Sequence, residues 1–239
     1  MTNISIGNIP LGEKVICVSP LTDIDVYSIE SVEGVDIIEL RIDMFSDISE
    51  KGTSDTFTVA RDKFNLPIIA TCRSHREGGA VDINDNLRLK LFKSVIDLSD
   101  AIDIEIRSKI SKDVISFAKD HNKTTIASYH DFKQTPNLST LEDIDKMGRD
   151  QNSDIVKIAV TPINYNDLRT LTEFTLKYHN KGIVTIAMGE LGRTSRLFLP
   201  LIGSLFTFAS IKTISAPGQL TIRELRQFFP AVVKTCKDL

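Results

Sequence analysis

Short apolar runs rich in valine and isoleucine recur along the chain, and each has the length of a buried strand. Between them lie segments with apolar residues at helical spacing, such as Leu87, Leu91 and Leu98, often preceded by Asn, Ser or Asp as candidate N-caps. This alternation predicts strands that are joined by helices. The predicted strands cover residues 15–19, 36–42, 67–73, 101–106, 124–130, 154–160, 182–188 and 208–213.

Eight strand-and-helix units in 239 residues favour a (β/α)8 barrel, or TIM barrel, whose usual size is about 250 residues. A doubly wound open sheet is the alternative, but no Gly-x-Gly-x-x-Gly turn follows the first strand to favour dinucleotide binding. No linker, low-complexity tract or change of composition divides the sequence. We therefore predict an α/β fold with a single TIM-barrel domain over residues 1–239.

Several of the predicted strands have one apolar and one charged face, because successive strand side chains point to opposite sides. Glu39 and Arg41 alternate with isoleucine and leucine in the second strand. Arg73, Asp103 and Glu105 alternate with apolar residues in the next two strands. Since helices cover the outside of a barrel, the charged face points into its lumen, where charges need partners or a ligand.

The same alternation turns Lys157, His130 and Met188 inward. Lys157 and His130, together with Arg41 and Arg73, lie at or past the middle of their strands, toward the C-terminal rim where TIM barrels keep their active sites. Each alone has a structural explanation, such as an ion pair or a buried structural histidine. Several buried charges of both signs are expensive to retain without a use, so the set as a whole predicts an active site.

Composition narrows the class of function further. With 41% hydrophobic and 26% charged residues the chain reads as an ordinary globular protein, and its longest apolar stretch is too short and too broken for a membrane span. The N-terminus lacks the pattern of a secretory signal, so we expect a cytoplasmic protein. Three cysteines without CxxC spacing indicate neither disulfides nor zinc, and a net charge of -3 argues against nucleic acid. A small-molecule substrate is the expected partner.

A buried lysine and a histidine in one lumen suggest a particular chemistry. A desolvated lysine beside cations such as Arg41 or Arg73 can be a neutral amine that attacks a carbonyl and forms a Schiff base. A histidine can then remove a proton from the carbon next to the imine. This chemistry needs no metal and no cofactor. The sequence has no metal-binding motif, although Asp103 and Glu105 could together hold a divalent ion.

Six separated motifs resemble one enzyme family, type I 3-dehydroquinate dehydratase of the shikimate pathway of aromatic amino acid biosynthesis. They fall in the right order from the second strand to the last loop, each at a predicted strand end. The motifs are ELRID (39–43), TCRSHREGG (71–79), SYHDF (128–132), VKIAV (156–160), AMGELGRTSR (187–196) and SAPGQL (215–220).

The resemblance implies roles for individual residues. Lys157 would form the imine with the C3 ketone of 3-dehydroquinate, and His130 would remove the C2 proton and help to expel the C1 hydroxyl. Glu77 would orient His130. The family positions that bind substrate are matched by Glu39, Arg41 and Arg73 for the ring hydroxyls, Arg196, Ser215 and Gln219 for the carboxylate, and Met188 for packing on the ring.

Some alternatives stay open from the sequence. His75 could replace His130 as the base, and a second arginine, Arg193, lies close to Arg196. A class I aldolase also uses a barrel lysine, and Gly189 and Gly192 could hold the phosphate of a phosphosugar. A phosphosugar isomerase or a barrel that binds a carboxylate without turnover would also fit. We further expect a homodimer, with residues 225–233 as a candidate contact, and a loop at 215–220 that closes over the substrate.

Overall fold

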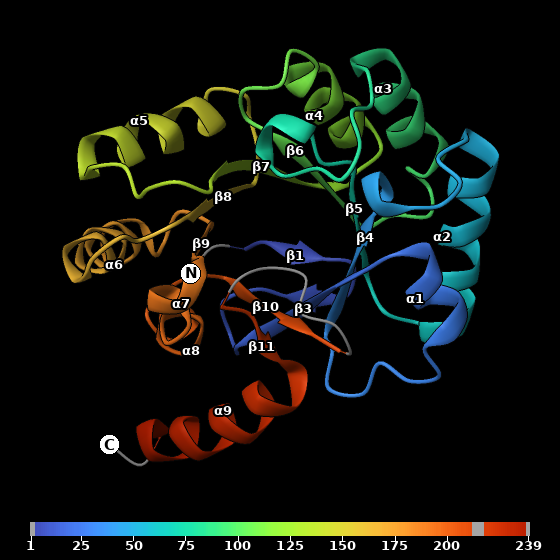
Figure 1. Cartoon of the computed structure of the whole chain (residues 1–239). Coiled ribbons are helices and arrows are strands. Elements are labelled where there is room, and N and C mark those ends of the chain that lie inside the picture. The colour runs from blue at the N-terminus through green and yellow to red at the C-terminus, as the bar shows by residue number, and fades with distance from the viewer. Residues whose placement is uncertain (1–2, 212–217, 238–239) are drawn as a thin grey trace.

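The computed structural model describes residues 3–211 and 218–237, and within them nine parallel strands form a curled sheet (Figure 1). Eight of them form the barrel, and the short β11 (Leu220–Thr221) pairs with the last of these. The barrel strands pair in sequence order, and the last of them also pairs with the first. The amide of Leu205 donates to the carbonyl of Ile183 at 2.9 Å, between the start of the last strand and its predecessor. The predicted α/β barrel is confirmed. Its strands are β3 (Ile16–Leu21), β4 (Ile37–Arg41), β5 (Ile68–Thr71), β6 (Ala101–Glu105), β7 (Thr124–Asp131), β8 (Ile155–Val160), β9 (Ile183–Ala187) and β10 (Phe206–Ser210).

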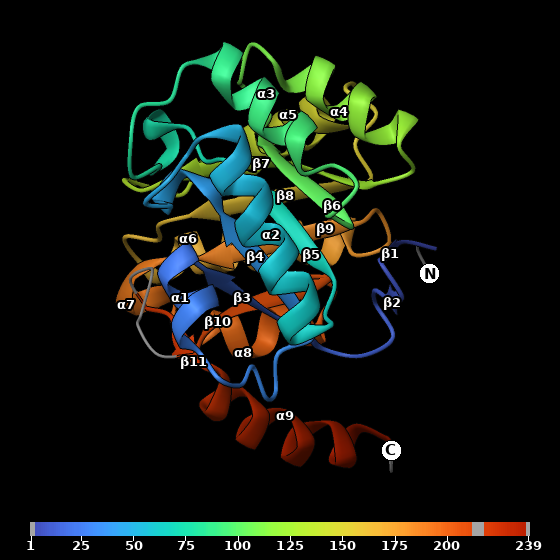
Figure 2. The same ribbon diagram turned by 90° about the vertical axis from the view of Figure 1, so that its right-hand side faces the viewer.

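Helices surround this sheet in both views (Figures 1 and 2). Ser49, Asn84, Asn137 and Asn164 act as N-caps, since each side chain accepts an amide hydrogen of the first helical turn. The longer helices are α2 (Glu50–Phe64), α3 (Asp85–Ser94), α4 (Ser111–Asp120), α5 (Leu138–Arg149), α6 (Tyr165–Tyr178) and α9 (Ile222–Lys237). The shorter ones are α1 (Asp23–Ser28), α7 (Gly189–Gly192), α8 (Ser195–Phe198) and the 3-10 turns η1 (Ile42–Met44), η2 (His75–Glu77) and η3 (Leu199–Leu201).

The position of the last barrel strand differs from the sequence prediction. The prediction of 208–213 was wrong at its start, because β10 already begins at Phe206. Phe206 and Phe208 alternate with Thr207, and both aromatic rings pack in the lumen. Residues 212 and 213 lie outside the described residues. Phe206 therefore belongs to the strand together with Phe208, as β-propensity favours, and not to the preceding loop.

Two apolar clusters separate the inside of the barrel from the outside. The larger cluster lies between sheet and helices and contains Ile38, Leu40 and Phe57. The smaller one fills the lower lumen, where Ile6 and Leu11 join strand residues. Ile6 comes from a short hairpin of β1 (Ser5–Ile6) and β2 (Ile9–Pro10). Apolar packing thus fills the N-terminal part of the lumen, while polar and apolar side chains share its C-terminal part.

Three aspartates at the N-terminal end of the barrel fix neighbouring strands. Asp36, Asp100 and Asp154 each stand directly before a strand, namely β4, β6 and β8. Each carboxylate accepts one amide hydrogen from the preceding strand or its start, at 2.8 to 2.9 Å. A basic side chain pairs with each of them as well. These contacts hold the strand starts in register.

Candidate active site

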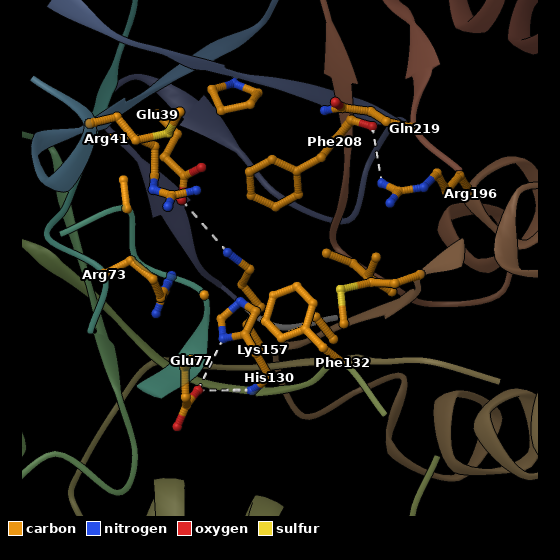
Figure 3. A pocket seen from close by; sticks show the side chains of 17 residues that line it. Glu39, Arg41, Arg73, Glu77, His130, Phe132, Lys157, Arg196, Phe208 and Gln219 are labelled. Atoms are coloured by element: carbon orange, nitrogen blue, oxygen red, sulfur yellow. Dashed lines mark hydrogen bonds and ion pairs between the residues drawn. The ribbon is translucent and has the colours of Figure 1, made fainter. Parts of the chain in front are cut away.

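A cavity of about 220 Å³ opens at the C-terminal end of the strands (Figure 3). Nine of the ten site residues predicted from the sequence line it, and the tenth, Ser215, lies outside the described residues. The nine are Glu39, Arg41, Arg73, Glu77, His130, Lys157, Met188, Arg196 and Gln219. They come from widely separated parts of the sequence, so the curled sheet brings them together.

Lys157 lies on β8 with only 4% of the residue exposed, and its amine contacts two carboxylates. Its Nζ lies 2.9 Å from Asp103 Oδ2 and 3.6 Å from Glu39 Oε1. The ring of Phe208 stands 4.4 Å from the same nitrogen, measured to the ring centroid. Carboxylates from β4 and β6 pair across the lumen with the ammonium group because desolvation makes an unpaired buried charge expensive.

His130 lies on β7, the strand next to Lys157, and Glu77 holds it in place. Glu77 Oε2 accepts the backbone N–H of His130 at 2.9 Å and lies 3.1 Å from its Nδ1. With Nδ1 engaged in this way, Nε2 is the ring nitrogen that remains for a substrate. Burial, reinforced by the cations Arg73 and Lys157, lowers the pKa of His130 well below its usual value. A neutral imidazole at neutral pH is the form that a base requires.

The loop that carries Glu77 is unusually tight, which explains the REGG motif. Gly78 ends η2 with a φ of 87°, a left-handed conformation that glycine adopts without strain. At Gly79 a Cβ atom would lie 2.2 Å from the carbonyl oxygen of Arg73, so any side chain would collide with the backbone. Burial raises the pKa of Glu77 to about 7. Its carboxylate therefore gains and loses its proton near neutral pH, as is typical of groups at functional sites.

Arg73 is at the centre of a buried ion network behind Lys157. Its guanidinium donates to Asp103 at 2.7 Å, to Glu105 at 3.0 Å and to the hydroxyl of Ser128 at 2.7 Å. Arg73 and Lys157 hold the pKa of Asp103 well below its usual value, against the effect of burial. The roles of Asp103 and Glu105, which the sequence left open, are thus to pair with cationic side chains.

Asp43 belongs to the site although sequence reasoning assigned it no role. It binds Arg41 through two hydrogen bonds of 2.9 and 2.8 Å, in the parallel geometry that arginine and carboxylate favour. It also accepts the backbone amides of Arg73 and Ala80, at 3.0 and 3.1 Å. Asp43 therefore ties the end of β4 to the Glu77 loop. The signal was its place in the ELRID motif, two residues after Arg41, although in the structure it lies in η1, just beyond the end of β4.

Arg196 and Gln219 lie across the cavity from Arg41 and Arg73 (Figure 3). Arg196, on α8, is buried, and this burial lowers the pKa of its guanidinium to about 10. The other arginine of the motif, Arg193, is half exposed and pairs with Glu224 at 3.1 Å. Phe208 was missed in the sequence, although its alternation with Thr207 turns it inward. Further lining residues without a predicted role are Pro20, Met44, Gly78, Ala80, Phe132, Ala159 and Ile186.

The competing assignments can be compared with this geometry. His75 Nδ1 lies 2.9 Å from the carbonyl oxygen of Gly79, and His75 is not among the described residues that line the cavity. A Cβ at Gly192 would lie 2.3 Å from the carbonyl oxygen of Ala187, so close packing of α7 on β9 accounts for this glycine without a phosphate. Within residues 3–211 and 218–237 no cluster of His, Cys, Asp and Glu could hold a metal ion.

Comparison with known proteins decides the family. The profile of the type I 3-dehydroquinase family matches residues 16–233. The chain belongs to this family. The 3-dehydroquinate dehydratase of Thermodesulfovibrio yellowstonii is 38% identical over 211 residues, which cover 87% of this chain and 92% of the relative. That of Methanococcoides burtonii is 33% identical over 228 residues, with 94% and 97% covered.

Solved structures of the family agree with the fold. The 3-dehydroquinate dehydratase of Geobacillus kaustophilus superposes with a TM-score of 0.91 at 28% identity, covering 97% of this chain and 96% of that one. The type I enzyme of Clostridium difficile, solved with covalently modified comenic acid, gives 0.89 at 28% identity, with 97% and 98% covered. The enzyme class predicted from the sequence, a hydro-lyase of this family, is confirmed by the membership.

Proposed function

We propose that the chain dehydrates 3-dehydroquinate to 3-dehydroshikimate through an imine on Lys157. The observation that carries this proposal is that Lys157 and His130, on adjacent strands, line the same cavity at the barrel rim. Membership of the type I family supports the substrate and a place in the shikimate pathway. The solved Clostridium difficile enzyme contains covalently modified comenic acid, which supports covalent chemistry in that relative.

The first stage joins substrate and enzyme. His130 takes a proton from Lys157, and the freed amine Nζ attacks the C3 ketone. His130 then returns this proton to the carbinolamine hydroxyl, which leaves as water and gives a protonated imine. The imidazole of His130 can accept the proton of Lys157 because burial keeps it neutral. Asp103 and Glu39, which pair with the ammonium group in the empty cavity, then lie beside the positive charge of the iminium. The charge of the site is therefore similar before and after the reaction with substrate.

The second stage is elimination. The protonated imine withdraws electrons from C2, so His130 can remove a C2 proton and leave an enamine. The enamine electrons then expel the C1 hydroxyl, which takes the proton from His130 and leaves as water. Hydrolysis of the new imine releases the product and restores the amine. Glu77, hydrogen-bonded to His130, stabilises the imidazolium that exists between the two proton transfers.

The cations of the cavity have a binding role in this proposal. We infer that Arg41, Arg73 and Glu39 contact the ring hydroxyls, while Arg196 and Gln219 contact the carboxylate and Met188 packs on the ring. Arginine suits a carboxylate because its planar fork can donate two parallel hydrogen bonds. The predicted role of Ser215 and the closure of the 215–220 loop concern a segment that lies mostly outside the described residues, so they stay predictions.

The homodimer and the cytoplasmic location also stay predictions. Leu225 and Phe229, within the candidate contact at 225–233, are buried in the chain itself. These two side chains therefore face the chain's own core and are not available to a partner. No helix among the described residues has the length and apolar character to cross a membrane.

Borohydride trapping tests the proposed function. Treatment of the protein with borohydride and 3-dehydroquinate should add one reduced ligand, and peptide mapping should place it on Lys157. Lys157→Met should give no adduct and no turnover, whereas Lys181→Met, a surface lysine, should behave as the unmodified chain does. Turnover without any adduct would refute the imine, and normal turnover of Lys157→Met would refute the assignment of the nucleophile.

A further inference from the structure

Arg88, on the outer helix α3, is a buried cation that the mechanism above does not use. It is 2% exposed and has the largest of the fully buried side chains. Neither it nor Glu105, which it contacts, is among the described residues that line the substrate cavity. A guanidinium in such a place is costly to desolvate, and an apolar side chain of similar volume would pack there without that penalty. Its retention therefore calls for an explanation in terms of its contacts.

Arg88 binds the backbone directly before Arg73. Its Nε and Nη2 donate to the carbonyl oxygen of Cys72 at 3.1 and 2.7 Å, and Nη2 also binds Glu105 Oε2. The other oxygen of Glu105 accepts Arg73 Nη1 at 3.0 Å and the amide of Ser74 at 2.8 Å. One side chain thus holds both the backbone that precedes Arg73 and the carboxylate that orients its guanidinium.

The contacts continue from Arg73 to the reacting nitrogen. Arg73 Nη2 donates to Asp103 Oδ1 at 2.7 Å, and the second oxygen of Asp103 lies 2.9 Å from Lys157 Nζ. Positive and negative groups alternate along this path, and each of them is at least 95% buried. Glu105 shares its charge between two guanidinium groups, so the loss of one would draw the other toward it.

We propose that Arg88 is a positioning residue: it fixes Arg73 and, through Asp103, Nζ of Lys157 in the geometry that substrate attack requires. This inference rests on the proposed function, which makes Lys157 the nucleophile. Without the fork of Arg88, the Arg73 guanidinium turns toward Glu105 and loosens its hold on Asp103. Misplacement of reacting groups by about 1 Å lowers rates by about 100-fold, so a helix outside the cavity controls the reaction through this path.

Arg88→Lys is the informative variant, because it keeps the charge beside Glu105 but cannot reach Glu105 and the Cys72 carbonyl with one fork. Imine trapping counts the competent sites, and kcat/KM is then expressed per trapped site. We expect Arg88→Lys to lower kcat/KM per trapped site by about 10- to 100-fold. In a chain that already carries Arg73→Lys, Arg88→Lys should lower kcat/KM per trapped site by less than about twofold. The residue through which Arg88 acts is then already altered.

Arg149→Lys is the matched control at the opposite end of the barrel. Arg149 likewise binds a carboxylate, that of Asp145, and two backbone carbonyls, those of Asp154 and Gly182. Its replacement should lower the melting temperature without changing kcat/KM per trapped site. Arg88→Lys with unchanged kcat/KM, or with the same loss in both Arg73 backgrounds, would overturn the positioning role. Failure of the unmodified chain to form an adduct would instead refute the proposed function.

Discussion

The two ends of the barrel use carboxylates in different ways. At the N-terminal end Asp36, Asp100 and Asp154 accept backbone amides, and the basic side chains that pair with them are roughly a third exposed. At the C-terminal end Asp103 and Glu105 are at least 98% buried and bind the side chains of cations. A backbone amide is fixed by the strand that carries it, so the first arrangement serves the fold.

The second arrangement is a poor way to stabilise a fold. Burying several charged side chains removes their hydration, and well-packed apolar residues of similar volume are often as stable or more stable. The cations of this network also surround a cavity that the apolar cluster of the lumen leaves open. The comparison teaches that buried charges indicate function where they converge on a cavity, and indicate structure where they end on backbone.

His130→Ala should have the largest effect of the four changes that test this comparison. Loss of the base should lower kcat by about 10²- to 10⁴-fold, because general base catalysis contributes that much. The imine should still form, so the substrate adduct on Lys157 should accumulate and be seen by intact mass after borohydride. His75→Ala is the control and should keep nearly normal turnover; the reverse pattern would make His75 the base.

Arg196→Met should mainly weaken substrate binding. Removal of one partner of a buried charge pair usually costs about 2 to 5 kcal/mol, and 2 kcal/mol corresponds to about 30-fold in affinity. We therefore expect KM to rise by about 30-fold or more, with a smaller change in kcat. Arg193→Met, on the exposed arginine that pairs with Glu224, should leave KM unchanged. Equal effects of the two changes would place the carboxylate elsewhere.

Much of the fold and of the site followed from the sequence, for a physical reason. Parallel strands covered by helices must turn their charged face inward, so alternation alone placed Lys157, His130 and Arg73 in the lumen. The same reasoning set β10 two residues too late, because phenylalanines near a strand start read equally well as loop packing. Phe208 was missed with it. Patterns locate strands better than they locate strand ends.

Partners inside the lumen could not be deduced from the sequence. Alternation tells which side chains share a face, but which of the inward carboxylates lies nearest to Lys157 depends on the relative heights of strands β6 and β8. The role of Arg88 could not be predicted from the sequence for another reason. It stands on a helix among leucines and looks like one more surface cation, and only the tertiary structure brings it to the carbonyl of Cys72. Long-range contacts of this kind leave no periodic signal.

Glu77→Gln should have a smaller effect on rate, about tenfold in kcat, but a distinctive effect on pH dependence. Burial raises the pKa of Glu77 to about 7. As pH falls through this value the carboxylate gains a proton and can no longer stabilise the imidazolium of His130, so kcat/KM of the unmodified chain should fall. The amide of glutamine does not titrate, and this acid limb should vanish in the variant. If kcat/KM of the variant still fell as pH drops through about 7, the titration would belong to another group.

Asp100→Ala should change stability alone, and so provides the sharpest contrast with the charges of the cavity. Asp100 directly precedes β6, and Asp103 lies three residues further along the same strand. Loss of the carboxylate leaves the amide of Ile68 without its acceptor and Arg61 without its partner. An unsatisfied buried amide costs about 1 to 3 kcal/mol, so the free energy of unfolding should fall by that amount in urea denaturation. Below the melting transition kcat and KM should be those of the unmodified chain. Asp100 pairs with Arg61, and neither is among the described residues that line the cavity. A change in KM would mean that strand register at one end of the barrel adjusts the site at the other, and the division between structural and functional carboxylates would not hold.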